Sequence, residues 1–176
     1  MPDFKLNDEL HNEVGRLSRV YYLQAQKCKN SKAYLAGCVM MGAALEASLL
    51  AFVNCYPDEA LRSPVAPTKK GKIKPLVKWS LAELLAVVKE RGWLLFGLSL
   101  NEQWVARRAH IGDYAEALRQ TRDLVHPVRY ALDLQRKRVT KRYLEKSFEI
   151  FEVVTAYFLK KLDESLRAAF KAQNEG

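Results

Sequence analysis

The feature that most restricts the fold of this chain is a long apolar run in its first third. Residues 33–53 read AYLAGCVMMGAALEASLLAFV, with Glu46 as the only charged residue. A helix that is apolar on nearly every face is buried on nearly every face. The run therefore predicts a central helix over residues 31–55. Gly37 and Gly42 lie inside this helix, where they are expected to allow close approach of other helices. They are not part of a glycine-rich phosphate-binding loop.

Apolar residues at three- and four-residue spacing predict further helices around the central one. Asn7 is placed to cap the first helix, and Ser80 with Glu83 forms a capping box for the third, which Gly92 is expected to end. The last helix would be roughly 50 Å long, so its end is expected to project or to pair with another subunit. The predicted helices span residues 8–28, 31–55, 80–91, 99–110, 113–126 and 140–172.

The segment between the second and third helices breaks the helical pattern. Residues 56–78 contain four of the six prolines together with a run of lysines, and they are predicted to form a basic, Pro-rich, mobile loop insertion. No alternating apolar pattern predicts a strand anywhere, and no repeat is present. The chain is expected to fold as one all-α domain over residues 1–176, an up-and-down bundle of four or five helices with a long C-terminal helix.

Charge and cysteine content narrow the range of partners and compartments. The formal net charge is +9 and the pI is about 9.5, values that favour polyanionic partners. Cys28, Cys38 and Cys55 are expected to be reduced, buried thiols of a cytoplasmic protein, because an odd number without paired spacing argues against a disulfide framework. The N-terminus lacks a signal-peptide pattern, and no uncharged apolar stretch reaches about 18 residues, so membrane insertion is not expected.

Three side chains in the fifth predicted helix form a chemically useful group. Arg119, Arg122 and His126 are three, four and seven residues apart, which puts them on one helical face. Arginine binds phosphate through two parallel hydrogen bonds, and histidine can take or give a proton near neutral pH. Together they would suffice for metal-independent RNA cleavage by the substrate's own 2′-hydroxyl.

Glu46 adds to this group from the central helix. A carboxylate among alanines and leucines is expensive to bury without a partner, and no basic residue lies nearby on its own helix. We therefore expect Glu46 to pair with Arg119 or Arg122 on a facing helix.

The segments ALRQTRDLVHP, AALEASLL and WSLAELLAVVKERGWL resemble the HEPN superfamily, in particular bacterial members with variants of LRxxRNxVHP. The similarity extends over residues 31–130, and the long last helix is in the expected place. The resemblance implies a bundle of four or five helices that is commonly dimeric. It also implies a metal-independent ribonuclease site in which arginine and histidine, with four to six residues between them, meet at the dimer interface.

Two arginines each match part of the family motif. Arg119 has six residues between it and His126, which matches the spacing of the resemblance, whereas Arg122 is followed by Asp123, a polar residue of the kind often found after the family's arginine. Both arginines therefore remain candidates, and Glu46 and Asp123 are candidate supporting residues. The structural alternative is that Arg122 and Glu46 only stabilise the bundle and His126 only ends a helix.

Two basic tracts could extend an RNA-binding surface. The tract TKKGKIK, residues 68–74, is more readily interpreted as a solvated loop, whereas the tract after His126 could continue its surface. The candidate RNA-binding residues are Arg129, Arg136, Lys137, Arg138, Lys141 and Arg142.

These features lead to one main functional hypothesis and two alternatives. The main hypothesis is a cytoplasmic, homodimeric, RNA-directed protein of the HEPN-like kind, a candidate metal-independent endoribonuclease of a defence, toxin-antitoxin or stress system with an antitoxin or operon partner. The alternatives are a non-catalytic interaction or dimerisation module, and a nonspecific nucleic-acid-binding protein. No cofactor is expected, and no metal site either, because His11 and His110 lack a second ligand at a suitable spacing.

Overall fold

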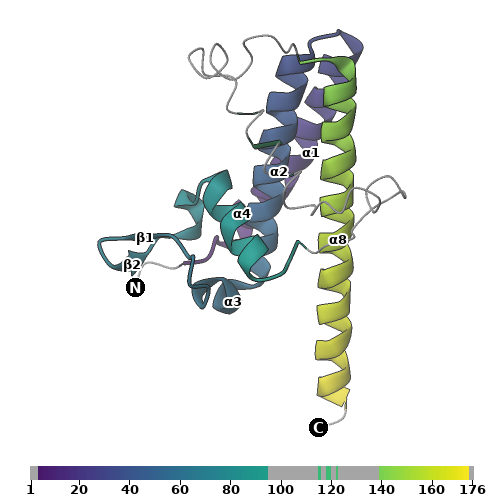
Figure 1. Ribbon diagram of the computed structural model, residues 1–176. Helices are drawn as coiled ribbons and strands as arrows, with labels where there is room; N and C mark the ends of the chain where they lie inside the picture. Colours follow the sequence, from purple (N-terminus) through teal and green to yellow (C-terminus); the bar gives the residue numbers. More distant parts are fainter. Residues whose placement is uncertain (1–3, 95–114, 116–117, 120–121, 123–138, 175–176) are drawn as a thin grey trace.

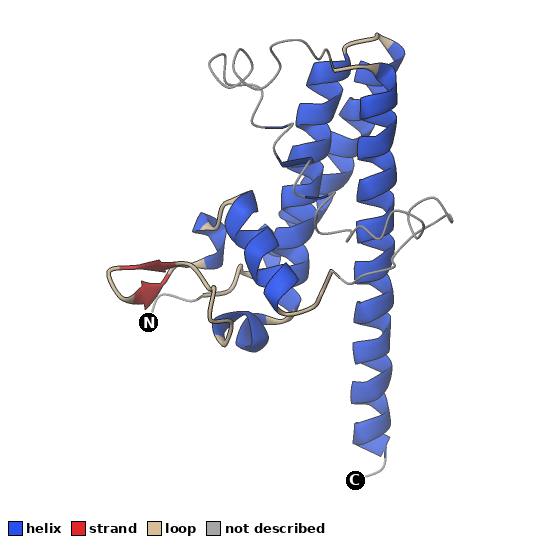
Figure 2. Cartoon of the chain, viewed as in Figure 1, coloured by secondary structure: helices blue, strands red, loops and turns tan. Residues whose placement is uncertain are grey.

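Three long helices lie side by side and form the body of the protein. The computed structural model describes residues 4–94, 115, 118, 119, 122 and 139–174. In it, α1 (Asp8–Asn30), α2 (Tyr34–Cys55) and α8 (Lys141–Asn174) run alongside one another, and the shorter α4 (Leu81–Glu90) packs against α2 (Figure 1). Nearly all regular structure in the described residues is helical (Figure 2), which confirms the all-α prediction at that level.

Helix α1 begins where the sequence predicts. The Asn7 side chain accepts a hydrogen bond from the Leu10 amide at 2.8 Å, and acidic residues in the first turn complement the helix dipole. The next helix begins later than predicted, at Tyr34 instead of Ser31. Ser31 belongs to the end of α1, because its amide donates to the Lys27 carbonyl at 3.0 Å, and Lys32 then turns the chain with a φ of 60°.

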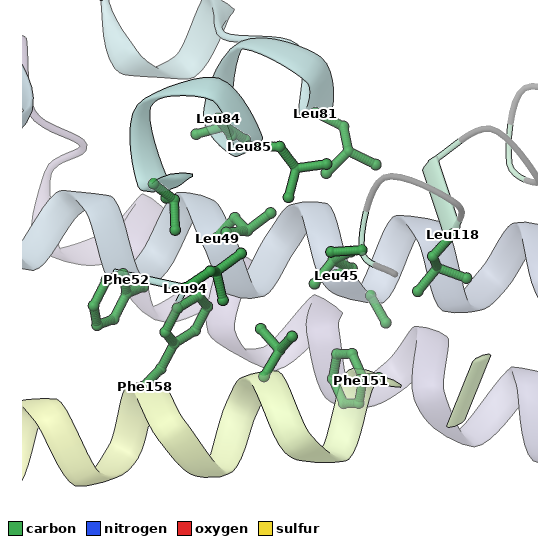
Figure 3. Close-up of a cluster of buried hydrophobic side chains, with 14 of the residues drawn as sticks. Leu45, Leu49, Phe52, Leu81, Leu84, Leu85, Leu94, Leu118, Phe151 and Phe158 are labelled. Atoms are coloured by element: carbon green, nitrogen blue, oxygen red, sulfur yellow. The ribbon is translucent and has the colours of Figure 1, made fainter. Parts of the chain in front are cut away.

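Helix α2 is the central helix that its apolar sequence predicts. Leu45 and Leu49 are fully buried, and they meet leucines of α4 on one side and phenylalanines of α8 on the other (Figure 3). Phe52 stacks on Phe158 of α8 with ring centroids 4.0 Å apart. Gly37 also has the predicted role, because a Cβ there would lie 2.6 Å from the Leu144 side chain of α8. The central helix thus touches α1, α4 and α8 at once.

Residues 56–78 contain more structure than the predicted loop. They form α3 (Pro57–Leu61), a two-stranded antiparallel ladder of β1 (Thr68–Lys69) and β2 (Lys72–Ile73), and the 3₁₀ turn η1 (Leu76–Lys78). The expectation that the chain has no strand is therefore wrong here. Strands of two residues are too short to show an alternating pattern, and the turn between them supplies the geometry instead.

Helix α4 has the predicted boundaries. The Ser80 hydroxyl accepts from the Glu83 amide, and the Glu83 carboxylate accepts from the Ser80 amide at 2.8 Å, which completes the capping box. After Arg91, Gly92 adopts a φ of 65°, a conformation that glycine reaches without steric cost. The capping residues therefore set both ends of this helix.

Helix α8 has 34 residues, and its second half extends beyond the other helices (Figure 1). Leu144, Phe148, Phe151 and Phe158 are buried, as the apolar stripe predicts. Leu166, further along the same helix, is 70% exposed. Every side chain described from residue 163 onward is exposed, and the projecting end is confirmed.

Helix α2 is long and apolar enough to cross a membrane by length and composition, and more than half of its apolar stretch is buried within the protein.

The expectation that all three cysteines are buried is wrong in part, because Cys28 is only partly buried. Cys38 is buried, and burial raises the pKa of its thiol to about 11. Cys55, in contrast, is exposed because α2 ends there.

Candidate functional site

The candidate site is built on a helical segment that packs against α2. Ala115, Leu118, Arg119 and Arg122 are helical, which agrees with the helix predicted over residues 113–126. Ala115 is fully buried, Leu118 is 1% exposed, and Leu118 belongs to the same buried hydrophobic cluster as Leu45 of α2 (Figure 3). The spacing of these two residues and Arg122 places all three on the face that meets α2.

Arg122 forms the ion pair that the sequence analysis predicted for Glu46. Its Nη1 lies 2.7 Å from Oε2 of Glu46, a distance typical of a charge-assisted hydrogen bond. The two side chains are 33% and 24% exposed, so the pair sits at the rim of the core and not inside it. Of the two arginines that the sequence offered as partners, Arg122 is the one that makes this contact.

Gly42 makes room for the Arg122 side chain. It lies one helical turn before Glu46, on the same face of α2. A Cβ at Gly42 would come within 2.6 Å of the Arg122 Cβ and within 3.1 Å of its Cγ. The aliphatic part of Arg122 therefore crosses the backbone of α2 directly above Gly42, and this path carries the guanidinium to Glu46.

This arrangement orients a guanidinium at a surface that water can reach. The Glu46 carboxylate fixes one Nη of Arg122, and a guanidinium has four further N–H donors with which it can bind an anion. Arg119 is half-buried and lies three residues earlier on the same helix, so its Cα is on the same side. The geometry suits recognition of a phosphate group.

The remaining predicted site residues fall into two groups. His126 and Asp123 lie outside the described residues, as do the predicted RNA-binding residues Arg129, Arg136, Lys137 and Arg138. Lys141 and Arg142 are described, and both are exposed in the first turn of α8.

Glu145 draws basic side chains from two helices together. Lys29 of α1 lies 3.1 Å from its carboxylate, and Lys141 of α8 lies 3.8 Å from the same oxygen. The hydrogen bond from Lys29, together with the nearby charges, lowers the pKa of the Glu145 carboxyl. The Lys29 contact was not predicted, because nothing in the sequence places the end of α1 beside the start of α8.

The described residues contain no group of three or more His, Cys, Asp or Glu side chains that could hold a metal ion. His11 has a structural contact: its Nδ1 lies 3.2 Å from the Asn54 side chain, which also bonds the Leu6 backbone. His110 lies outside the described residues.

Comparison of the chain with protein-family models, with curated proteins and with solved structures found no match.

Proposed function

We propose that this protein is an RNA-directed, homodimeric, cytoplasmic protein with a HEPN-like bundle, and that it cleaves RNA without a metal ion. The observation that carries the proposal is the position of Arg122, held against Glu46 over Gly42 with its guanidinium partly exposed. An arginine that is oriented in advance loses little conformational freedom when it binds a phosphate. Arg119 on the same helix would supply the second cation.

The proposed reaction is transesterification within the substrate. His126 takes the proton of a 2′-hydroxyl, the 2′-oxygen attacks the adjacent phosphorus, and the bond from phosphorus to the 5′-oxygen breaks as that oxygen accepts a proton from water. The products carry a 2′,3′-cyclic phosphate and a 5′-hydroxyl. Arg119 and Arg122 would stabilise the charge that develops on the phosphate oxygens. Lys141 and Arg142 would hold the flanking phosphates.

The test is cleavage of a labelled mixed-sequence RNA in EDTA. Wild-type protein is expected to cleave, and His126→Ala is expected to lose at least about a hundredfold in rate, since general acid–base catalysis contributes that much or more. His11→Ala is the matched control, because it removes a histidine that contacts Asn54. Equal cleavage by wild type and His126→Ala would contradict the assigned role, and cleavage that requires a divalent metal would contradict the mechanism.

A second candidate function is a non-catalytic interaction module, with a second copy or an antitoxin or operon partner as its ligand. The observation that favours it is the apolar surface on the projecting half of α8, where Leu159, Leu166 and Phe170 are 68%, 70% and 69% exposed. If this alternative is correct, His126→Ala changes the melting temperature or assembly, and neither wild type nor variant cleaves RNA.

A further inference from the structure

The small hairpin next to α4 presents three lysines in a defined geometry. Thr68 faces Ile73 and Lys69 faces Lys72 across the ladder, so Lys70 and Gly71 form the two-residue turn. Both turn residues have positive φ, 52° and 74°, as a type I′ hairpin turn requires. The hairpin extends away from the three long helices (Figure 1).

The base of the hairpin is tied to the folded core. The Lys74 amide donates to the Pro67 carbonyl at 2.9 Å, and the Lys74 side chain bonds Glu83 of α4. The Trp79 indole, only 3% exposed, donates to the Lys74 carbonyl at 3.0 Å. Lys74 therefore has a structural role, whereas the lysines nearer the tip are held out from a fixed base.

The charges at the tip reduce the stability of the hairpin. Lys69, Lys70 and Lys72 are all exposed, and none has an ion-pair partner within the described part of the chain. Lys69 and Lys72 stand directly opposite each other, and like charges in that position are destabilising. Lys70 occupies a backbone region that costs about 1 kcal/mol for a residue other than glycine, asparagine or aspartate. A bound polyanion would offset the repulsion between Lys69 and Lys72.

We propose that this hairpin is a second RNA contact, which grips the phosphate backbone of a single strand through Lys69, Lys70 and Lys72. The inference rests on the proposed function in that it takes RNA as the ligand. No aromatic side chain is present between Thr68 and Lys74, and Trp79 is buried, so the hairpin has nothing on which a base could stack. The contact should therefore be independent of base sequence and should position RNA without selecting it.

The test is equilibrium binding of a fluorescent, non-cleavable 2′-O-methyl RNA, followed by anisotropy over a range of salt concentrations. The hairpin variant is Lys69→Gln/Lys70→Asn/Lys72→Gln, in which Asn next to Gly71 is well suited to the turn. The control, Arg19→Gln/Lys160→Gln/Arg167→Gln, removes the same number of exposed charges from α1 and α8. A second hairpin variant, Lys69→Arg/Lys72→Arg, keeps the charge and should bind as wild type does.

Each single-strand phosphate contact contributes about 0.7 to the slope of log K against log salt. We expect the hairpin variant to reduce that slope by about 2 and to weaken binding on the order of tenfold or more at moderate salt, with little change in the control. If the wild-type protein binds RNA and the hairpin and control variants lose equal affinity, the inference is wrong and the proposed function stands. No RNA binding by wild type would overturn both, and binding to polyglutamate in place of RNA that is lost in the hairpin variant would assign the hairpin to an acidic protein.

Discussion

Arg122 reaches Glu46 only because residue 42 has no side chain. The aliphatic part of the arginine lies over the Gly42 backbone, and its guanidinium ends against a carboxylate one turn further along α2. Three residues on two helices therefore act as a unit, in which the glycine allows the approach and the glutamate sets the orientation. Changes at each position test a different part of this unit.

The ion pair should show measurable coupling. In a double-mutant cycle of Glu46→Ala, Arg122→Ala and the double variant, we expect a coupling energy of about 1 kcal/mol, above most surface pairs because both side chains are two-thirds or more covered. Midpoints of urea unfolding provide the measurement. Additive effects of the two single changes would mean that the contact does not contribute to stability.

Gly42→Ala should destabilise the protein although alanine is the better helix former. The gain in helix propensity is about 1 kcal/mol, but a Cβ 2.6 Å from the Arg122 Cβ forces a shift that typically costs 1–3 kcal/mol, so we expect a net loss of roughly 1 kcal/mol. Gly15→Ala is the matched control, since nothing lies within 4 Å of a Cβ there, and it should be stabilising. Thermal melts of both variants decide the point, and a stabilised Gly42→Ala would contradict the packing.

The sequence predicted that Glu46 pairs with an arginine of a facing helix, but it did not predict how the two helices pack against each other. A carboxylate in an apolar helix needs a cation, and the arginines of a facing helix were the available choice. The selection of Arg122 over Arg119 depends on how the two helices are rotated against each other. Gly42 allows the close approach of the two helices, and this effect can be seen only when the positions of both backbones are known.

Among the elements, the hairpin and α4 depend on a shared carboxylate. Glu83 accepts hydrogen bonds from the Ser80 amide and hydroxyl at the start of α4, and it also bonds the Lys74 side chain at the base of the hairpin. Burial acts to raise the pKa of the Glu83 carboxyl, but the hydrogen bonds from Lys74 and Ser80 outweigh it, so the pKa lies below its ordinary value. One side chain therefore caps a helix and anchors a turn.

This link should respond to acid. Because the pKa of Glu83 is lower in the folded protein, its stabilising contribution is present above the ordinary value of 4.5 and is lost as the pH falls through the folded value. We expect wild-type stability to decline below about pH 4.5, with roughly 0.5–1 kcal/mol of the decline absent in Glu83→Gln. Urea unfolding of both proteins from pH 3 to pH 6 measures this, and parallel pH profiles would exclude the contribution.

The elements were predictable where a local signal sets their ends. The capping box of α4 and the Asn7 cap of α1 are local signals, and both were predicted correctly. The start of α2 was placed too early, at Ser31, whose hydroxyl instead bonds carbonyls at the end of α1. The hairpin was missed since its Lys70–Gly71 turn departs from the usual Asn–Gly pair.

The molecule as a whole is asymmetric along α8. The first half of this helix is buried against α1 and α2, and hydrogen bonds such as Tyr22 to Glu152 at 2.8 Å tie it there. The end of the helix carries an apolar stripe with no cover among the described residues. The proposed homodimer could cover this stripe.

Serine substitution of Leu159, Leu166 and Phe170 should weaken self-association without unfolding the bundle. These side chains are about 70% exposed, so their replacement removes little core contact. Leu144→Ala is the contrasting variant, because Leu144 is fully buried and its truncation typically costs 2–5 kcal/mol. Sedimentation velocity reports the oligomer and thermal melts report the fold. An unchanged oligomer in the serine variant would exclude this surface from the dimer interface.

The position of α8 late in the chain has a consequence for biosynthesis. Helices α1 and α2 leave the ribosome one after the other, whereas the phenylalanines that cover α2 from the other side are made much later. At roughly 5–20 residues per second, the face of α2 that receives α8 stays open to solvent or to chaperones for some seconds.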